Sequence, residues 1–570
     1  MINKINTILK ICVKLLLILL VTLAINASKA WSYQMAANDN AGSIHTDKPF
    51  YVVGEVIWFK VYLPDRLQYR RSLARIDLIS RRKEILHTQH ISVDKQNNGQ
   101  GYYLIPYDFK PDIYFLTVTV FNEDGNYPLT LVYHPVAIYN DLHPMDTTLI
   151  DFERPMIPAS ETAVSKPNAS INISSDKSIY RPREAVSLKI RVTDPKGEAV
   201  QGNLSVSVTD KDLIDGHPKN ISNFSKGPDV TQSFLVDNQI AVRGMVKHTV
   251  DKQVYESDYL AAVMGEEGLM IPFESYDDGT FEIDLPYFDG KRQMQLVAYL
   301  TNDIFTTLDQ AVSLPANMSE MALTYTKEVL RYLKVSRKRK KINQLFDRLA
   351  FQSLPAIQPS ENKWEPDRSL DLNHYEPFES MEEFFVQVVT PLKIKKRKDS
   401  SYQIRMVNPD NKPFYPGVPR FFIDGRVVDD PVEAVSLDMK SIRRIDLFYF
   451  YKNLNRQFDQ FGSTSGVVAI YTRDGNYHKD NQTQSNVFQV HGGLPEASFP
   501  SIPAAAADAE QNAPIFQPVI YWNPSINTNE QGEAEVKFFH SDDRGTFKVE
   551  VVCNCGNGQM VIETSEYKTR

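Results

Sequence analysis

Strict alternation of apolar and polar residues is the feature that most constrains this chain. It runs through Ile57–Leu63, Val186–Val192 and Leu204–Thr209, and the turn residues Asp194–Gly197 separate the last two runs. A period of two places every second side chain on the same face, so each run predicts a half-buried strand. Strands of this kind, joined by turns, predict a mainly β fold class built from tandem β-sandwiches.

The composition is sufficient for several packed cores. The chain has 570 residues, of which 42% are hydrophobic, with 30 Phe and 28 Tyr. At roughly 150 residues per domain this length predicts about four domains. The 63 Lys and Arg against 71 Asp and Glu give a formal charge of −8, which offers no overall positive field. We therefore expect no nucleic-acid partner.

The N-terminus has the order of a secretory signal peptide. Three lysines precede the apolar run Leu15–Ile25, and Ser28–Ala30 supplies small residues before a cleavage site. This pattern predicts a signal peptide over residues 1–30. The eleven apolar residues fall short of the ~20 that a membrane-spanning helix needs. We expect an exported protein, periplasmic or associated with the outer membrane, with no transmembrane span after cleavage.

Two cysteines, Cys553 and Cys555, remain after removal of this peptide. Three interpretations are open: a redox-labile bridge across one residue, an incidental pair, or metal ligands. Two thiolates without a nearby His or further Cys cannot complete a tetrahedral zinc shell. We therefore expect no metal and no cofactor.

Residues 45–63 and 174–192 are two copies of one motif. The copies pair Asp47 with Asp176, Lys48 with Lys177, Tyr51 with Tyr180, Glu55 with Glu184 and Lys60 with Lys189. The motif resembles the opening run of the MG2-type macroglobulin domain of the α2-macroglobulin superfamily, although Arg183 stands where the first copy has Gly54. The resemblance implies macroglobulin-like β-sandwiches at 41–140 and 165–232. We interpret the repeated residues as a structural corner.

The middle of the chain divides into two parts. Residues 233–315 contain turns followed by alternating strands and resemble the carboxypeptidase regulatory-like domain, a small transthyretin-like sandwich. Residues 316–372 predict a connecting helix followed by a polar linker. Within the helix, Lys334–Lys341 holds six basic residues in eight. We interpret this run as a solvated helix face, with an acidic lipid surface or nucleic acid as alternatives.

A small mixed α/β unit is predicted next. Ser380–Glu383 is a capping box that opens a short helix, and strands are predicted at Phe421–Ile423, Ile442–Leu447 and Val467–Tyr471. These runs resemble the plug domain of TonB-dependent receptors, over residues 373–480. The motif residues of the resemblance are Asp424, Gly425, Gly462 and Gly466, for which we expect structural roles at turns and close approaches.

The receptor barrel is not expected in this chain. Only 97 residues follow Arg473, whereas a barrel of some twenty-two strands needs several hundred. A plug-like unit without a barrel leaves a surface for water or a partner. The candidate docking surface consists of the aromatic residues Phe448, Tyr449, Phe450, Tyr451, Phe458 and Phe461.

Residues 481–515 predict a linker, and residues 516–570 resemble a C-terminal macroglobulin-like β segment. No Cys-Gly-Glu-Gln thioester sequence is present. No zinc-protease, phosphate-loop or nucleophile-elbow motif occurs either. The sequence therefore predicts a non-enzymatic exported cell-envelope protein that binds another envelope protein. The alternative is a thioester-independent, macroglobulin-like endopeptidase inhibitor with Val487–Pro514 as its bait.

Overall fold

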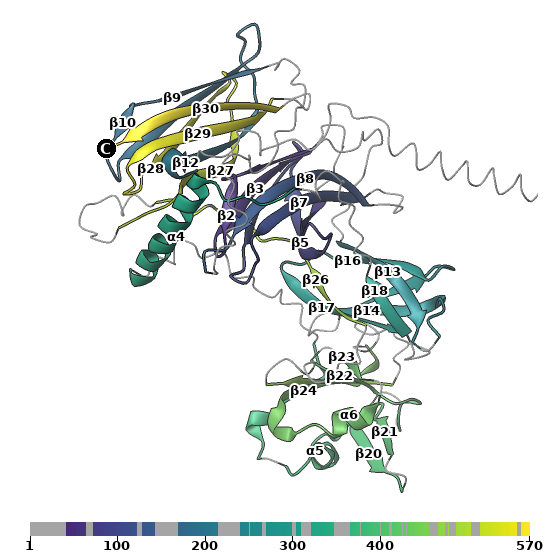
Figure 1. Cartoon of the computed structure of the whole chain (residues 1–570). Coiled ribbons are helices and arrows are strands. Elements are labelled where there is room, and N and C mark those ends of the chain that lie inside the picture. Colours follow the sequence, from purple (N-terminus) through teal and green to yellow (C-terminus); the bar gives the residue numbers. More distant parts are fainter. Residues whose placement is uncertain are drawn as a thin grey trace, which may run out of the picture. The chain divides into compact units, whose positions relative to one another are not determined.

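The computed structural model describes most of the chain from residue 42 onward. The described residues are 42–63, 72–121, 128–142, 169–214, 240–249, 251–264, 269–298, 304–308, 321–346, 365–376, 378–398, 401–409, 413–424, 426–428, 430–452, 454, 465–473, 477, 486–502, 514–555 and 560–570. The predicted signal peptide lies outside them. Most elements are strands (Figure 1), and this confirms the predicted mainly β fold class.

The chain folds into two compact units, each built from separate stretches of sequence. The first comprises Met1–Asp237, Val312–Pro355 and Glu496–Arg570, and the second comprises Asn238–Ala311 and Ala356–Pro495. The sequence predicts one independent block from residue 30 to about 315. Asn238–Ala311, within the stretch predicted as a regulatory-like sandwich, instead belongs to the same unit as the α/β domain. Local sequence patterns identify strands, but they do not report which strands share a core.

Eight strands in the first unit form one sheet, in the order β1-β3-β6-β5-β4-β7-β8-β2. They are β1 (Ser43–Thr46), β2 (Phe50–Val52), β3 (Val56–Tyr62), β4 (Ser72–Ile79), β5 (Ile85–Val93), β6 (Asn98–Leu104), β7 (Asp112–Phe121) and β8 (Pro128–Tyr139). The sheet curls so that β1 and β8, near its opposite ends, lie close together. A Cβ added at Gly42, just before β1, would lie 2.8 Å from Val132 of β8. Large aromatic side chains such as Phe50, Phe59 and Phe115 fill its interior.

A second sandwich in this unit is assembled from both ends of the sequence. One sheet has the order β10-β30-β29-β12-β27 and the other has the order β28-β11-β9. The strands are β9 (Ser170–Ser175), β10 (Ile179–Tyr180), β11 (Ala185–Thr193), β12 (Asn203–Asp210), β27 (Val519–Asn527), β28 (Glu533–Phe539), β29 (Gly545–Asn554) and β30 (Met560–Thr569). Residues 165–232 and 516–570, predicted as separate domains, thus share one sandwich and one apolar core.

Two helices accompany these sheets among the described residues of the first unit. The short α2 (Lys211–Ile214) follows β12, and α4 (Lys327–Leu345) returns from the second unit. Thr326 caps α4, and its hydroxyl accepts a hydrogen bond from the Val329 N–H at 3.3 Å. The side chains of Val329, Tyr332, Leu333 and Ser336 recur at helical spacing and are buried. The connecting helix is therefore packed into the first unit along one face.

The second unit contains a seven-stranded sheet in the order β18-β13-β16-β15-β14-β17-β26. The strands are β13 (Ile240–His248), β14 (Ser257–Met264), β15 (Leu269–Ser275), β16 (Thr280–Leu285), β17 (Lys291–Ala298), β18 (Ile304–Leu308) and β26 (Val487–His491). Strand β26 lies within the stretch predicted as the linker 481–515, yet it pairs with β17 from Lys291 to Gln295. Backbone pairing across about 200 residues of chain leaves no local signature in the sequence.

The other part of the second unit is the small mixed α/β domain. Its sheet has the order β19-β24-β25-β22-β23, and a separate hairpin joins β20 and β21. The elements are β19 (Arg368–Asp371), η3 (Leu372–His374), α5 (Met381–Gln387), β20 (Leu392–Lys396), β21 (Tyr402–Met406), β22 (Arg420–Ile423), β23 (Arg426–Val428), α6 (Pro431–Val435), η4 (Met439–Ser441), β24 (Ile442–Phe448) and β25 (Val467–Thr472). At the predicted capping box, the Ser380 hydroxyl accepts from the Glu383 N–H at 3.2 Å. Phe384 and Phe385 of α5 then lie in the domain core.

Candidate functional site

The first copy of the repeated motif forms a buried cluster of hydrogen bonds before β3. The Asp47 carboxylate accepts from the Tyr51 hydroxyl at 2.6 Å and from the Trp58 backbone N–H at 3.0 Å. Burial raises the pKa of Asp47 to about 7, although the positive charge of Lys48 opposes this shift. The motif residues bond to one another, which is the structural role that the sequence predicts for them.

Helix α4 covers this cluster with Tyr332. Lys48 Nζ donates to Glu55 Oε2 at 2.5 Å, and the Tyr332 hydroxyl donates to Glu55 Oε1 at 2.8 Å. Burial raises the pKa of Glu55, but the charge and hydrogen bond of Lys48, the hydrogen bond from the Val52 N–H and the charge of Lys340 together outweigh burial, so the net shift of the pKa is downward. Glu55 is thus held as a carboxylate whose charge Lys48 already neutralises.

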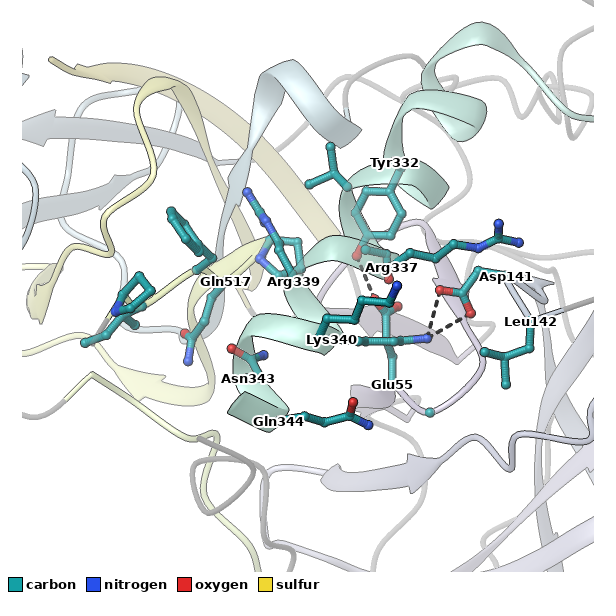
Figure 2. Close-up of a pocket in the computed structure, with 18 of the residues that line it drawn as sticks. Glu55, Asp141, Leu142, Tyr332, Arg337, Arg339, Lys340, Asn343, Gln344 and Gln517 are labelled. Carbon is teal, nitrogen blue, oxygen red and sulfur yellow. Dashed lines mark hydrogen bonds and ion pairs between the residues drawn. The ribbon is translucent and has the colours of Figure 1, made fainter. Parts of the chain in front are cut away.

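A cavity of about 440 Å³ lies beside this cluster (Figure 2). The second half of α4 forms one wall, Tyr107 and Leu142 come from loops of the first sheet, and Pro514–Pro518 forms another wall. The volume falls in the range of small-ligand pockets, roughly 300 to 1,000 Å³. This cavity is the candidate binding site of the first unit.

The basic run of α4 is divided between internal ion pairs and solvent. Arg339 pairs with Asp543 and lies 3.8 Å from Asp210, whereas Lys340 lies 3.0 Å from Asp141. The sequence predicts a solvated face and misses these two anchors. Helical spacing could have identified these two ion pairs, because Arg339 and Lys340 continue the buried row of α4 by one further turn.

The plug-like motif residues that the structure describes have structural positions. Asp424 follows β22 with φ +48°, and its carboxylate accepts from the Thr472 N–H at 2.7 Å and from the Tyr477 N–H at 3.2 Å. Gly466 has φ +95°, and an added Cβ there would lie 2.7 Å from Met406. Gly425 and Gly462 lie outside the described residues.

The predicted aromatic docking surface is split between core and surface. Phe448 ends β24 in the domain core, and Tyr449 packs partly against that core. Phe450 and Tyr451 are 41% and 52% exposed. The backbone N–H groups of Tyr449 and Phe450 both donate to the Asp367 carboxylate, at 2.6 and 2.8 Å. Phe458 and Phe461 lie outside the described residues.

The described residues also bear on the cysteine pair, on metal binding and on membrane-spanning helices. Cys553 and Cys555 are joined as a disulfide, with 5.5 Å between their Cα atoms. Within the described ranges, no group of three or more His, Cys, Asp or Glu is arranged to hold a metal ion. No helix of that same part is long and apolar enough to cross a membrane.

Comparison with known proteins finds no sequence family. No protein-family model matches the chain, and no curated protein matches it. Among solved structures, trypsin-activated α2-macroglobulin of Escherichia coli aligns at 9% identity and a TM-score of 0.23, covering 93% of this chain and 41% of that one. The native form aligns at 10% identity and a TM-score of 0.24, covering 95% and 40%. The E. coli adhesin FdeC aligns at 11% identity and a TM-score of 0.13, covering 47% of this chain and 94% of the adhesin. The chain spans about two fifths of the length of the α2-macroglobulins, and such low TM-scores establish no common overall fold.

Proposed function

We propose that this protein is a non-enzymatic, exported component of the cell envelope that docks another envelope protein. The α/β domain, which resembles a receptor plug, supplies the docking surface, and the sandwiches act as supporting and spacing domains. The signal-peptide pattern of residues 1–30 supports export to the periplasm or the outer membrane.

The observation that carries the proposal is the exposed pair Phe450 and Tyr451. Both residues follow the end of β24, whose last residue, Phe448, is fully buried. The Asp367 carboxylate holds the local backbone through two N–H groups, so the aromatic pair is presented from an ordered support. Ordered, exposed aromatic side chains lose little conformational entropy on binding and are enriched at protein interfaces.

The test replaces both exposed aromatics, in Phe450→Ser together with Tyr451→Ser. The matched control is Tyr276→Ser, which removes a 62% exposed tyrosine from the turn between β15 and β16 of the same unit. A photo-cross-linker in place of the exposed Lys452 or Asp277, beside the substituted positions, identifies the contacted protein in intact envelopes. We expect one discrete cross-linked partner from position 452, lost in the double variant and kept in Tyr276→Ser, with unchanged melting.

Two outcomes contradict the proposal. Equal cross-linking from positions 452 and 277 means that the exposed aromatics have no special role. A fall in melting temperature of several degrees for the double variant means that the pair contributes to the core.

The inhibitor alternative requires an exposed bait between Val487 and Pro514. Val487–His491 is instead a paired strand, and Phe499 packs against Trp58 at a ring distance of 5.8 Å. Residues 503–513 of the predicted bait lie outside the described residues. No structural observation favours inhibition, so we do not extend the proposal to it.

A further inference from the structure

We infer that the exposed face of α4 docks onto the surface of an anionic phospholipid bilayer. This face belongs to the first unit, whereas the docking surface proposed for the α/β domain belongs to the second. The inference combines three features of α4: a stripe of unpaired cations, an exposed apolar end and an opposite face that is anchored in the protein.

Four cations of α4 form a basic stripe. They recur at intervals of three, four and seven residues, which places them on one side of a helix: Lys334, Arg337, Lys338 and Lys341. All four are exposed, and none has an ion pair or hydrogen bond to another described residue. The helix offers them no carboxylate, because no Asp or Glu occurs from Arg331 to Leu345. The basic stripe therefore carries uncommitted positive charge, although the whole chain has a formal charge of −8.

The basic stripe ends in exposed apolar side chains. Leu345 lies four residues after Lys341, hence on the same side of the helix, and it is 81% exposed. Phe346, the C-cap residue of α4, is 47% exposed. Large apolar side chains that remain exposed beside charged groups often mark a contact with a protein or a membrane.

A bilayer surface matches both parts of this face. Its anionic headgroups attract the four cations, and the acyl region just below them takes up apolar side chains at the end of the helix. A nucleic acid or an acidic protein segment pairs with the cations but offers no acyl layer to Leu345 and Phe346. The combination of charge and apolar end therefore favours the bilayer.

The opposite face of α4 is anchored in the first unit. Its buried row ends with Ser336, and Arg339 and Lys340 continue it through ion pairs with Asp543 and Asp141. The helix is thus formed before any bilayer is met, so docking does not have to bear the entropy cost of folding it. The basic stripe lies on the side that these contacts leave free.

Co-sedimentation of the full-length mature chain with vesicles tests the docking. One vesicle is phosphatidylcholine alone, and the other contains about one-third phosphatidylglycerol, which supplies the negative charge. We expect binding to the anionic vesicles to exceed binding to the neutral ones by at least about tenfold, and to weaken as salt screens the charges. A short DNA duplex and polyglutamate, titrated at the same ionic strength, should bind more weakly than the anionic vesicles.

A double variant locates the binding on the basic stripe. Lys334→Gln together with Lys338→Gln should weaken binding to the anionic vesicles by at least about tenfold, since each cation contributes roughly fivefold. The matched control is Lys95→Gln together with Lys110→Gln, which removes the same charge from two exposed lysines of the first unit outside α4. This control should bind nearly as well as the wild type, and both double variants should keep its melting temperature.

Two further variants examine the apolar end. Leu345→Ser should weaken binding to the anionic vesicles several-fold, because it removes apolar surface from the acyl region. Phe346→Trp adds a fluorophore to the four Trp of the chain. Phosphatidylcholine that is brominated in its acyl chains should quench the fluorescence of this variant more than that of the wild type.

Three results overturn the inference. Equal binding to neutral and anionic vesicles removes the role of charge. An equal loss in the stripe variant and in its control means that net charge, and no particular face, attracts the chain. Unchanged binding of Leu345→Ser without excess quenching of Phe346→Trp, or tighter binding to DNA or polyglutamate than to the anionic vesicles, means that the basic stripe takes a soluble polyanion.

Discussion

The two copies of the repeated motif form the same hydrogen bonds in different surroundings. In the second copy the Asp176 carboxylate accepts from the Tyr180 hydroxyl at 2.7 Å and from the Ser187 N–H at 2.9 Å. Lys177 pairs with Glu184, as Lys48 pairs with Glu55 in the first copy. Arg183 adopts φ +62° where Gly54 has φ +80°. The motif therefore specifies the geometry of the corner in both places, even without the glycine.

Burial separates the two corners. The Lys48 side chain is 4% exposed beneath Tyr332, whereas the Lys177 side chain is 51% exposed. Burial raises the pKa of Asp47 to about 7. The hydrogen bond from Tyr180 lowers the pKa of Asp176, because little desolvation opposes it. Identical local contacts thus have opposite electrostatic consequences, which depend on what covers them.

The largest difference between the corners is expected for Glu55→Gln against Glu184→Gln. Glu55→Gln leaves the Lys48 charge buried without its partner, so we expect a loss of about 4 kcal/mol in local stability. Glu184→Gln breaks a solvent-exposed pair and should cost only a small fraction of that. Hydrogen exchange of the peptides around β3 and β11 measures both. Equal losses would mean that burial does not distinguish the corners.

The contributions of Asp47 and Asp176 to stability should change with pH in opposite directions. Asp47 has a folded-state pKa above its unfolded value, so stability falls as pH rises between about 4 and 7. Between pH 5 and 8 the wild type should therefore lose about 3 kcal/mol relative to Asp47→Asn. Asp176 has a lowered pKa, so it stabilises above its unfolded pKa and loses that contribution only in more acidic solution.

Urea unfolding of the wild type, Asp47→Asn and Asp176→Asn at pH 5 and 8 measures these differences. The wild type and Asp176→Asn should differ by the same amount at both pH values. A constant difference between the wild type and Asp47→Asn would contradict the raised pKa of Asp47.

Gly54→Ala tests the backbone of the first corner. The residue has positive φ, and an added Cβ would lie 2.3 Å from the Tyr107 ring, so we expect a loss of about 2 kcal/mol. Gly197→Ala is the control, because Gly197 has φ +88° with open space around it. The excess loss at Gly54 in thermal melting measures the contact with Tyr107. A larger loss at Gly197 would contradict this account.

The smallest effect is expected for Tyr332→Phe, which removes the hydroxyl that bonds Glu55. We expect a loss of about 1 kcal/mol, because the carboxylate keeps Lys48 as a partner. Tyr567→Phe is the matched control beside the second corner, since the buried Tyr567 hydroxyl has no hydrogen-bond partner among the described residues. Urea unfolding should show no loss for this control. Equal losses would mean that the α4 contact does not stabilise the first corner.

At the candidate sites, too, burial depends on the tertiary structure and does not follow from the local sequence. The run from Phe448 to Tyr451 was predicted as one aromatic surface, but β24 ends inside it, so Phe448 is in the core while Phe450 is exposed. Strand alternation predicts opposite faces, not the residue at which a strand leaves the core. The α4 cavity was not predicted, because its walls come from three distant stretches of the chain.

The sequence by itself determined the strands that alternate strictly, the two corners, the capped helix α5 and the mainly β fold class. These features depend on neighbours within a few residues, where periodicity and hydrogen-bonding geometry act directly. Only the tertiary structure decided where the polar faces of the strands lie. Strand β3 was predicted to be half-buried, but Lys60 and Tyr62 on its polar face bond Asn203 and Ser205 of β12 and are buried. Alternation specifies that a face is polar; whether water or a second polar face satisfies it depends on which domains pack together.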